Sequence, residues 1–168
     1  SARLAELAAH LKEETEKLGL PMPRFLMEPG RSIVADAGMT LYTVGSVKRI
    51  PGYKQYAAVD GGMTDNPRYA LYQSRYTVYH AHKSGSMERF DVVGRCCESG
   101  DIIQPGVELP GDTCRGDILA VCTTGAYNYS MASNYNRLPR PAVVMLTPDR
   151  IYEAVRRETF ADLTALDL

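Results

Sequence analysis

The sequence predicts a mainly β fold, an antiparallel β-barrel or sandwich with a helix at each end. From residue 24 onward, short segments are rich in Val, Ile, Thr and Tyr, and turn residues separate them at intervals of roughly ten residues. A charged stretch with leucines at helical spacing precedes these segments, and a helix-capping pattern follows them. The 168 residues are enough to bury one hydrophobic core.

Residues 2–19 are predicted to form the first helix, because Leu4, Leu7 and Leu11 fall on one face and Gly19 offers a stop. A short apolar strand is then expected at 24–28. Further strands are expected at 32–38, 39–50, 53–62, 75–82, 89–97, 117–127 and 141–147. Thr147 and Pro148 then predict the cap and first residue of a terminal helix.

This order of elements suggests two parts. A single helix and strand cannot cover their own apolar faces, so residues 1–30 are interpreted as the remnant of the end of a β/α barrel. Residues 31–168 are interpreted as a C-terminal β-domain with a terminal helix. The chain is therefore expected to be a piece of something longer.

Charge and hydropathy narrow the possible partners. The chain carries 19 basic and 20 acidic residues, a balance that gives no reason to expect a nucleic-acid partner. No apolar run approaches the roughly 18 residues that a membrane span needs. We therefore expect a cytoplasmic protein with neither a nucleic-acid nor a membrane partner.

The four cysteines are Cys96, Cys97, Cys114 and Cys122. No pair has the two-residue spacing typical of a zinc site, so no metal is expected. Nothing else marks a small secreted scaffold, and the thiols are predicted to be reduced, without disulfides.

Two loops could hold an anionic ligand. In "EPGR", Glu28 ends a strand, Gly30 allows close backbone approach, and Arg31 offers a planar fork for a carboxylate. In 60–72, Arg68 and Tyr72 are four residues apart, so one helical turn would bring guanidinium and phenol together. A plain turn and a solvated loop are the alternatives.

The stretch "CCESGD" carries the most reactive groups. A thiol can serve as an acid, base or nucleophile, and Glu98 could accept an ammonium group. Adjacent cysteines on a strand would point to opposite faces, and Cys96 is interpreted as a packing residue. The hydroxyl-rich loop 123–136 could contact a phosphate or could be an ordinary connection.

Taken in order, "EPGR", "DGGMTDNPRYALY", "CCESGD" and "GAYNYSMASNYN" resemble the C-terminal half of the diaminopimelate decarboxylase family, which uses pyridoxal 5'-phosphate. The resemblance spans the whole chain. It implies conversion of meso-diaminopimelate to L-lysine and carbon dioxide. It also implies a β/α barrel that binds the cofactor, a β-domain that closes the site, and a homodimer with shared active sites.

The resemblance also implies a role for each motif residue. Cys97 matches the thiol near the reacting carbon, and Glu98 matches the group that reads the distal ammonium. The remaining substrate contacts would be Arg31, Arg68, Tyr72 and Tyr127. The cofactor contacts would be Glu28, Gly30, Arg31 and Tyr127.

The five lysines, in contrast, do not match the family's Schiff-base lysine. The chain alone is therefore expected to be inactive. Two alternatives remain: a related decarboxylase of basic amino acids or carboxylated polyamines, and a non-catalytic β-barrel interaction module.

Overall fold

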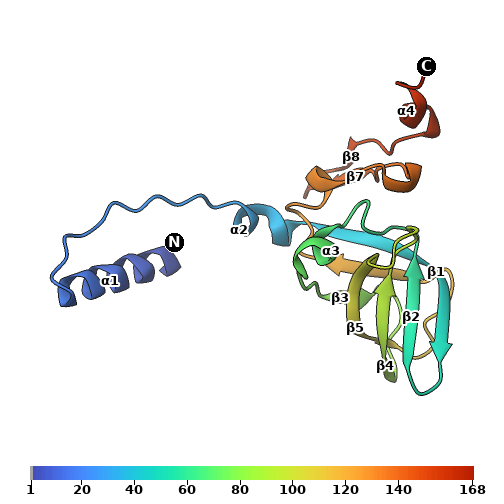
Figure 1. The fold of residues 1–168 in the computed structure, drawn as a ribbon, viewed down its shortest axis with the longest axis horizontal. Coiled ribbons are helices and arrows are strands. Elements are labelled where there is room, and N and C mark those ends of the chain that lie inside the picture. The colour runs from blue at the N-terminus through green and yellow to red at the C-terminus, as the bar shows by residue number, and fades with distance from the viewer. Residues whose placement is uncertain (1) are drawn as a thin grey trace.

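A computed structural model describes residues 2–168, and a mainly β architecture is confirmed (Figure 1). The strands are β1 (Met39–Ile50), β2 (Lys54–Val59), β3 (Val78–His80), β4 (Met87–Val93), β5 (Ile102–Pro110), β6 (Ile118–Cys122), β7 (Val143–Leu146) and β8 (Ile151–Val155). The α-helices are α1 (Ala2–Lys17), α2 (Arg31–Val34), α3 (Arg68–Tyr72) and α4 (Phe160–Thr164). Three 3₁₀ turns complete the chain: η1 (Ala35–Ala37), η2 (Tyr129–Met131) and η3 (Tyr135–Arg137).

Six strands form one curled sheet in the order β3-β6-β1-β2-β4-β5. Every pairing is antiparallel except that of β2 with β4. The two edge strands, β3 and β5, lie against each other, so the sheet is nearly a closed barrel. At this seam the backbone N–H of Tyr76 donates to the side-chain oxygen of Gln104, 2.7 Å away. Near-closure removes most of the open sheet edge.

The core fills the inside of this barrel. Alternate residues of each strand point inward, as the burial of Leu119 and Val121 on β6 shows. The largest fully buried apolar side chains are Phe90, Ile103, Leu109 and Leu119. The sheet therefore provides a rigid base for the loops at its ends.

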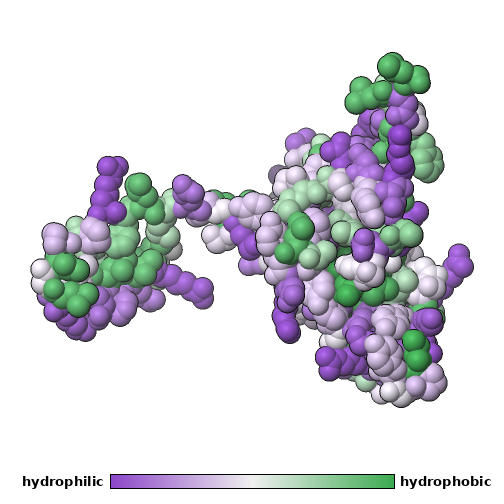
Figure 2. Space-filling model, viewed as in Figure 1, coloured by the Kyte–Doolittle hydropathy of each residue, from purple (hydrophilic) through white to green (hydrophobic). Residues whose placement is uncertain are grey.

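The helix predicted at the N-terminus is confirmed, but the strand expected at 24–28 is wrong. Residues 20–30 have no helix or strand, and α1 lies apart from the sheet (Figure 1). A strand needs a hydrogen-bonded neighbour, and none runs beside this segment. Leu4 and Leu7 of α1 are exposed, as is Leu26 in the segment that follows, and Figure 2 shows apolar surface on α1.

The segment 32–38 was also predicted as a strand, and it is helical instead. It forms the end of α2 and the whole of η1. The carbonyl of Ala35 accepts the N–H groups of Gly38 and Gly125, at 3.2 and 3.0 Å. The turn is therefore set by a contact with a segment 90 positions further along, which local pattern does not reveal.

Strand β5 was missed because its sequence, "IIQPGVELP", carries two prolines and a glycine. Gly106 has φ +66° in a bulged part of the strand, where its N–H donates to Asp91. The prolines lie at the barrel seam and at the end of the strand, where a missing ladder donor is tolerated.

The predicted terminal helix starting at Thr147 is wrong in its position. Thr147 and Arg150 close a tight turn, since the Thr147 N–H donates to the Arg150 carbonyl at 3.0 Å. The turn joins β7 to β8 in a separate hairpin. The capping box sits later, at Thr159 and Asp162, and opens the short α4. Within residues 2–168, no helix has the length and apolar character to cross a membrane.

Candidate functional site

Four of the predicted site residues form one cluster of arginines and tyrosines. The guanidinium carbons of Arg31 and Arg68 lie 5.3 and 5.5 Å from the centre of the Tyr127 ring. The Arg68 carbon also lies 4.5 Å from the Tyr72 ring, so the predicted helical turn is confirmed as α3. We call Arg31, Arg68, Tyr72 and Tyr127 the arginine cluster.

Close backbone packing brings these residues together. After β6 the chain runs against α2 and η1, and the Thr124 N–H donates to the Gly38 carbonyl at 3.0 Å. A Cβ at Gly125 would lie 2.0 Å from the Val34 carbonyl oxygen, so only glycine fits there. Two residues later, Tyr127 has φ +62°, an uncommon conformation for a bulky residue and a frequent sign of a functional site.

The arginine cluster contains unsatisfied donors. Within residues 2–168, Arg31 Nη2 and Arg68 Nε are buried and have no hydrogen-bond partner. A buried donor without an acceptor is costly, and such groups usually mark the place of a ligand, ion or water. Two guanidinium groups near one phenol fit a phosphate or carboxylate group.

The second group of predicted residues lies on a turn that follows β4. Cys97 and Glu98 are both exposed, and Cys96 is half-buried. The two cysteines sit in this turn and not on a strand, so the reason given for their opposite orientation is wrong. β4 ends at Val93, and the chain then folds back toward Asp101 through a hydrogen bond from the Gly94 N–H.

The buried carboxylate of Asp101 joins this turn to the loop 60–66. Its two oxygens accept the N–H groups of Met63 and Cys96, each at 2.6 Å. Burial raises the pKa of the Cys96 thiol, and the charge of Asp101 raises it further. Cys96 is therefore held in a packed position as its neutral thiol, as the packing interpretation expects.

A third segment, 133–137, touches both loops. The Cys97 N–H donates to Asn136 Oδ1 at 2.8 Å, and the Ser133 N–H donates to the Thr64 carbonyl at 2.8 Å. Glu158 holds the same segment from the C-terminal side. Its carboxylate accepts from Asn134 Nδ2 at 2.7 Å and from the Arg140 N–H and Nε at 2.8 and 2.7 Å.

The Glu158 contact should make the packing of this segment sensitive to acid. Hydrogen bonds from Arg140 lower the pKa of Glu158 from 4.5 to about 2. Because the pKa is lowered by folding, the stabilisation is complete above pH 4.5 and is lost as the pH falls toward about 2. We expect residues 134–158 to unfold at a lower urea concentration at pH 3 than at pH 6. Their amide NMR resonances measure this unfolding.

The variant Glu158→Gln isolates this effect from other acid-sensitive groups. At pH 6 the variant should lower the urea concentration at which this segment unfolds. The difference in that concentration between variant and parent chain should shrink as the pH is lowered. A constant difference between pH 6 and pH 3 would contradict the role of the Glu158 charge.

Apart from Glu28, the predicted site residues thus fall into two groups on one chain, the arginine cluster and the Cys97–Glu98 turn. Gly30 lies at the arginine cluster, where an added Cβ would be 2.6 Å from the Tyr127 hydroxyl oxygen. Glu28 lies on the exposed segment before α2, and the structure does not bring it to either group. Asp101, Asn136 and Glu158 were missed. Asp101 belongs to the motif "CCESGD", but the sequence does not reveal the distant partners of Asn136 and Glu158.

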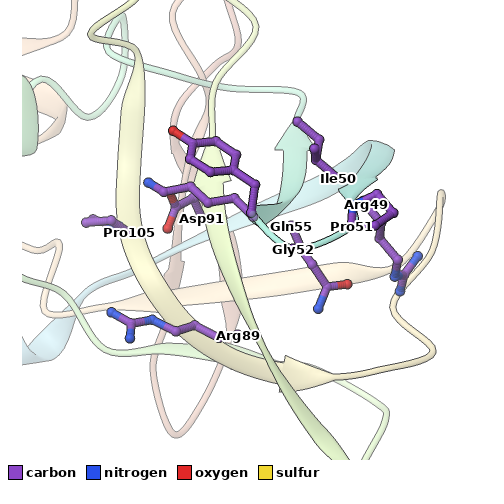
Figure 3. A pocket seen from close by; sticks show the side chains of 10 residues that line it. Arg49, Ile50, Pro51, Gly52, Gln55, Arg89, Asp91 and Pro105 are labelled. Carbon is purple, nitrogen blue, oxygen red and sulfur yellow. The ribbon is translucent and has the colours of Figure 1, made fainter.

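A hollow of about 830 Å³ lies elsewhere, across the β1–β2 hairpin and strands β4 and β5 (Figure 3). Its charged groups are largely satisfied within the chain. Lys54 Nζ lies 2.7 Å from Asp91 Oδ2, and Arg49 Nη2 donates to the Gly111 carbonyl at 2.6 Å. The hollow contains none of the predicted site residues. In the described part of the chain, no group of three His, Cys, Asp or Glu residues could hold a metal.

Comparison with known proteins identifies similar sequences and structures. Residues 31–125 match the C-terminal sheet domain of pyridoxal-dependent decarboxylases. The chain is 51% identical over 160 residues to the diaminopimelate decarboxylase of Bacillus subtilis (strain 168), which covers 94% of this chain and 36% of that protein. The chain thus spans about a third of the length of the relatives that it matches.

Two solved structures illustrate the structural similarity. The diaminopimelate decarboxylase of M. jannaschii in co-complex with L-lysine is 35% identical, with a TM-score of 0.81 over 93% of this chain and 36% of that chain. The lysine/ornithine decarboxylase of Vibrio vulnificus complexed with cadaverine is 27% identical, with a TM-score of 0.61 over 72% of this chain and 33% of that chain.

Proposed function

Because the chain belongs to the pyridoxal-dependent decarboxylases, whose C-terminal sheet domain it contains, we propose that it supplies the sheet-domain side of a diaminopimelate decarboxylase active site. The reaction would convert meso-2,6-diaminopimelate to L-lysine and carbon dioxide. The buried, unsatisfied donors of the arginine cluster are the observation that carries this proposal.

The substrate chemistry agrees with the residues present. Diaminopimelate has an amino group and a carboxylate at each end, so a selective site needs cationic forks and a separate acceptor for the distal ammonium. Arg31 and Arg68 would bind carboxylate or phosphate oxygens, with Tyr72 and Tyr127 packed against their guanidinium planes. The exposed carboxylate of Glu98 would accept the distal ammonium.

The cofactor would lie against the same cluster. Arg31, the Gly30 backbone and Tyr127 would face its phosphate, and Glu28 would join them if the segment before α2 packs against the cofactor. When bound, pyridoxal phosphate supplies the electron sink for loss of carbon dioxide. The thiol of Cys97 would hold the proton that the reacting carbon needs afterwards.

Two alternatives are less well supported. The first alternative, a decarboxylase of other basic amino acids, is supported by a 27% identity to the lysine/ornithine enzyme. This identity is much lower than the 51% identity to a diaminopimelate decarboxylase. A non-catalytic interaction module would have no need of two buried guanidinium groups without acceptors.

We also propose a homodimer with shared active sites in the cytoplasm. The arginine cluster and the Cys97–Glu98 turn are separate groups on one chain, and a site built from two chains could use both. Leu41, Met39 and Tyr79 are exposed on the outer face of the barrel and could be covered by a partner. All four cysteines are free, which supports a reducing compartment.

The test is an enzyme that carries residues 31–168 of this chain in place of the matching part of the B. subtilis relative. We expect it to release carbon dioxide and lysine from meso-diaminopimelate. Arg68→Lys keeps the charge but loses the planar fork, so kcat/KM should fall about 10- to 150-fold, since a hydrogen bond to a charged group contributes roughly 1.5–3 kcal/mol.

Arg150→Lys is the matched control, because Arg150 also lies over a tyrosine ring, 4.3 Å from the centre of Tyr152, but outside the arginine cluster. It should leave kcat/KM unchanged. Turnover of lysine or ornithine but not diaminopimelate would support the first alternative instead. No turnover of any of them, in a folded and cofactor-loaded enzyme, would overturn the proposal.

A further inference from the structure

A side chain from a distant segment holds the Cys97 peptide in the Cys97–Glu98 turn. The Cys97 N–H donates to Asn136 Oδ1 at 2.8 Å, across 39 positions of sequence. Within the turn itself, the Glu98 N–H donates to the Cys96 carbonyl at 2.8 Å. This carbonyl and the Cys97 N–H belong to one planar peptide group, so the group is held on one side by the turn and on the other by Asn136. Asn136 therefore supplies the long-range contact that orients the peptide next to the exposed thiol.

Asn136 is held in an unusual backbone conformation. It has φ +54° and ψ +23°, and the next residue, Arg137, has φ +55°. Consecutive left-handed residues are unfavourable, although asparagine tolerates this region better than most. Such a conformation persists only where the surrounding structure fixes it.

Contacts on both sides of Asn136 provide that support. The Ser133 N–H donates to the Thr64 carbonyl, and Asn134 Nδ2 donates to Glu158. On the other side, Arg137 Nη1 donates to the Leu163 carbonyl at 3.0 Å and lies 3.0 Å from Asp167 Oδ2. The exposed Arg137–Asp167 pair contributes little. Glu158 is less exposed and also binds Arg140, so its side is the stronger of the two.

From these contacts we propose that Asn136 is a positioning residue for Cys97, and that the C-terminal segment from Glu158 onward holds Asn136 in place. Asn136 acts through the Cys97 peptide. The inference rests on the proposed function, in which the Cys97 thiol holds a proton for the reacting carbon. Cys96, half-buried behind Asp101, cannot take over this role without breaking the turn.

The hydrogen bond itself can be tested on the 168-residue chain without any activity. Asn136→Gly keeps the left-handed backbone accessible but removes the acceptor, whereas Asn136→Asp keeps an acceptor oxygen. In the glycine variant, hydrogen exchange of the Cys97 amide should be about tenfold faster, as expected for loss of a typical hydrogen bond. The aspartate variant should exchange like the parent.

Alkylation by iodoacetamide gives a second measurement on the same variants. Peptide mass spectrometry resolves Cys97 from Cys114, which is also exposed and lies in another loop. In the Asn136→Gly variant, the alkylation rate of Cys97 should change while the alkylation rate of Cys114 stays the same. Equal exchange and equal alkylation in the parent chain and both variants would overturn the inference.

The positioning role is tested in the enzyme that carries this chain. Asn136→Gly should lower kcat about tenfold, because a displaced proton donor slows the chemical step, while KM stays close to that of the parent. Asn136→Asp should restore kcat. A faster amide exchange combined with an unchanged kcat would overturn the inference and leave the proposed function standing. An enzyme inactive on diaminopimelate even with Asn136 present would instead refute the proposed function.

Discussion

Gly125→Ala is expected to lower the free energy of unfolding by about 3 kcal/mol, at the upper end of the range for overpacked sites. The new Cβ would lie 2.0 Å from the Val34 carbonyl oxygen and 3.0 Å from that of Ala35. Both neighbours are backbone atoms, so α2 or the segment after β6 must move. Since α2 carries Arg31 and this segment carries Tyr127, the same change should separate the arginine cluster.

Urea unfolding and the NMR resonances of the Tyr127 ring test the two parts of this prediction. Gly85→Ala is the matched control, because no atom lies within 4 Å of its added Cβ. The control should keep both the stability and the Tyr127 resonances of the parent chain. If Gly125→Ala were as stable as Gly85→Ala, the close contact between α2 and this segment would be wrong.

Asp101→Ala is expected to lower the free energy of unfolding by about 3 kcal/mol, because each buried donor left without an acceptor costs roughly 1–3 kcal/mol. The carboxylate is 4% exposed and accepts the N–H groups of Met63 and Cys96. Without it, the turn that carries Cys97 loses its link to the loop 60–66. Cys97 should also become more reactive toward iodoacetamide.

Asp101→Asn should fall between the parent and the alanine variant, since the amide keeps one acceptor oxygen. Asp112→Ala provides an exposed aspartate as the control, with a side chain that is 72% exposed. A loss of stability at Asp112→Ala equal to that at Asp101→Ala would mean that the bridge between the two loops does not stabilise the fold.

The accuracy of the sequence predictions followed the range of the interactions involved. Strand β1 was predicted with its observed bounds, Met39–Ile50, because a segment rich in Val, Ile, Thr and Tyr that turn residues follow is a local signal. The turn of α3 was predicted from the spacing of Arg68 and Tyr72, which is also local. Strand β5 was hidden by Pro105 and Gly106, which a bulge at the barrel seam accommodates.

The sequence by itself determined the mainly β fold, the family and the motif residues, because strand-forming segments, turn residues and ordered motifs lie in contiguous stretches. Only the tertiary structure decided that Arg31 and Arg68 both lie at the ring of Tyr127, and that the side chain of Asn136 accepts the Cys97 N–H. It also decided that residues 32–38 are helical, through the carbonyl of Ala35 that receives the Gly125 N–H. The physical reason is that these contacts join residues 39 to 96 positions apart, and pairing over such distances depends on how the sheet closes, which no local pattern encodes.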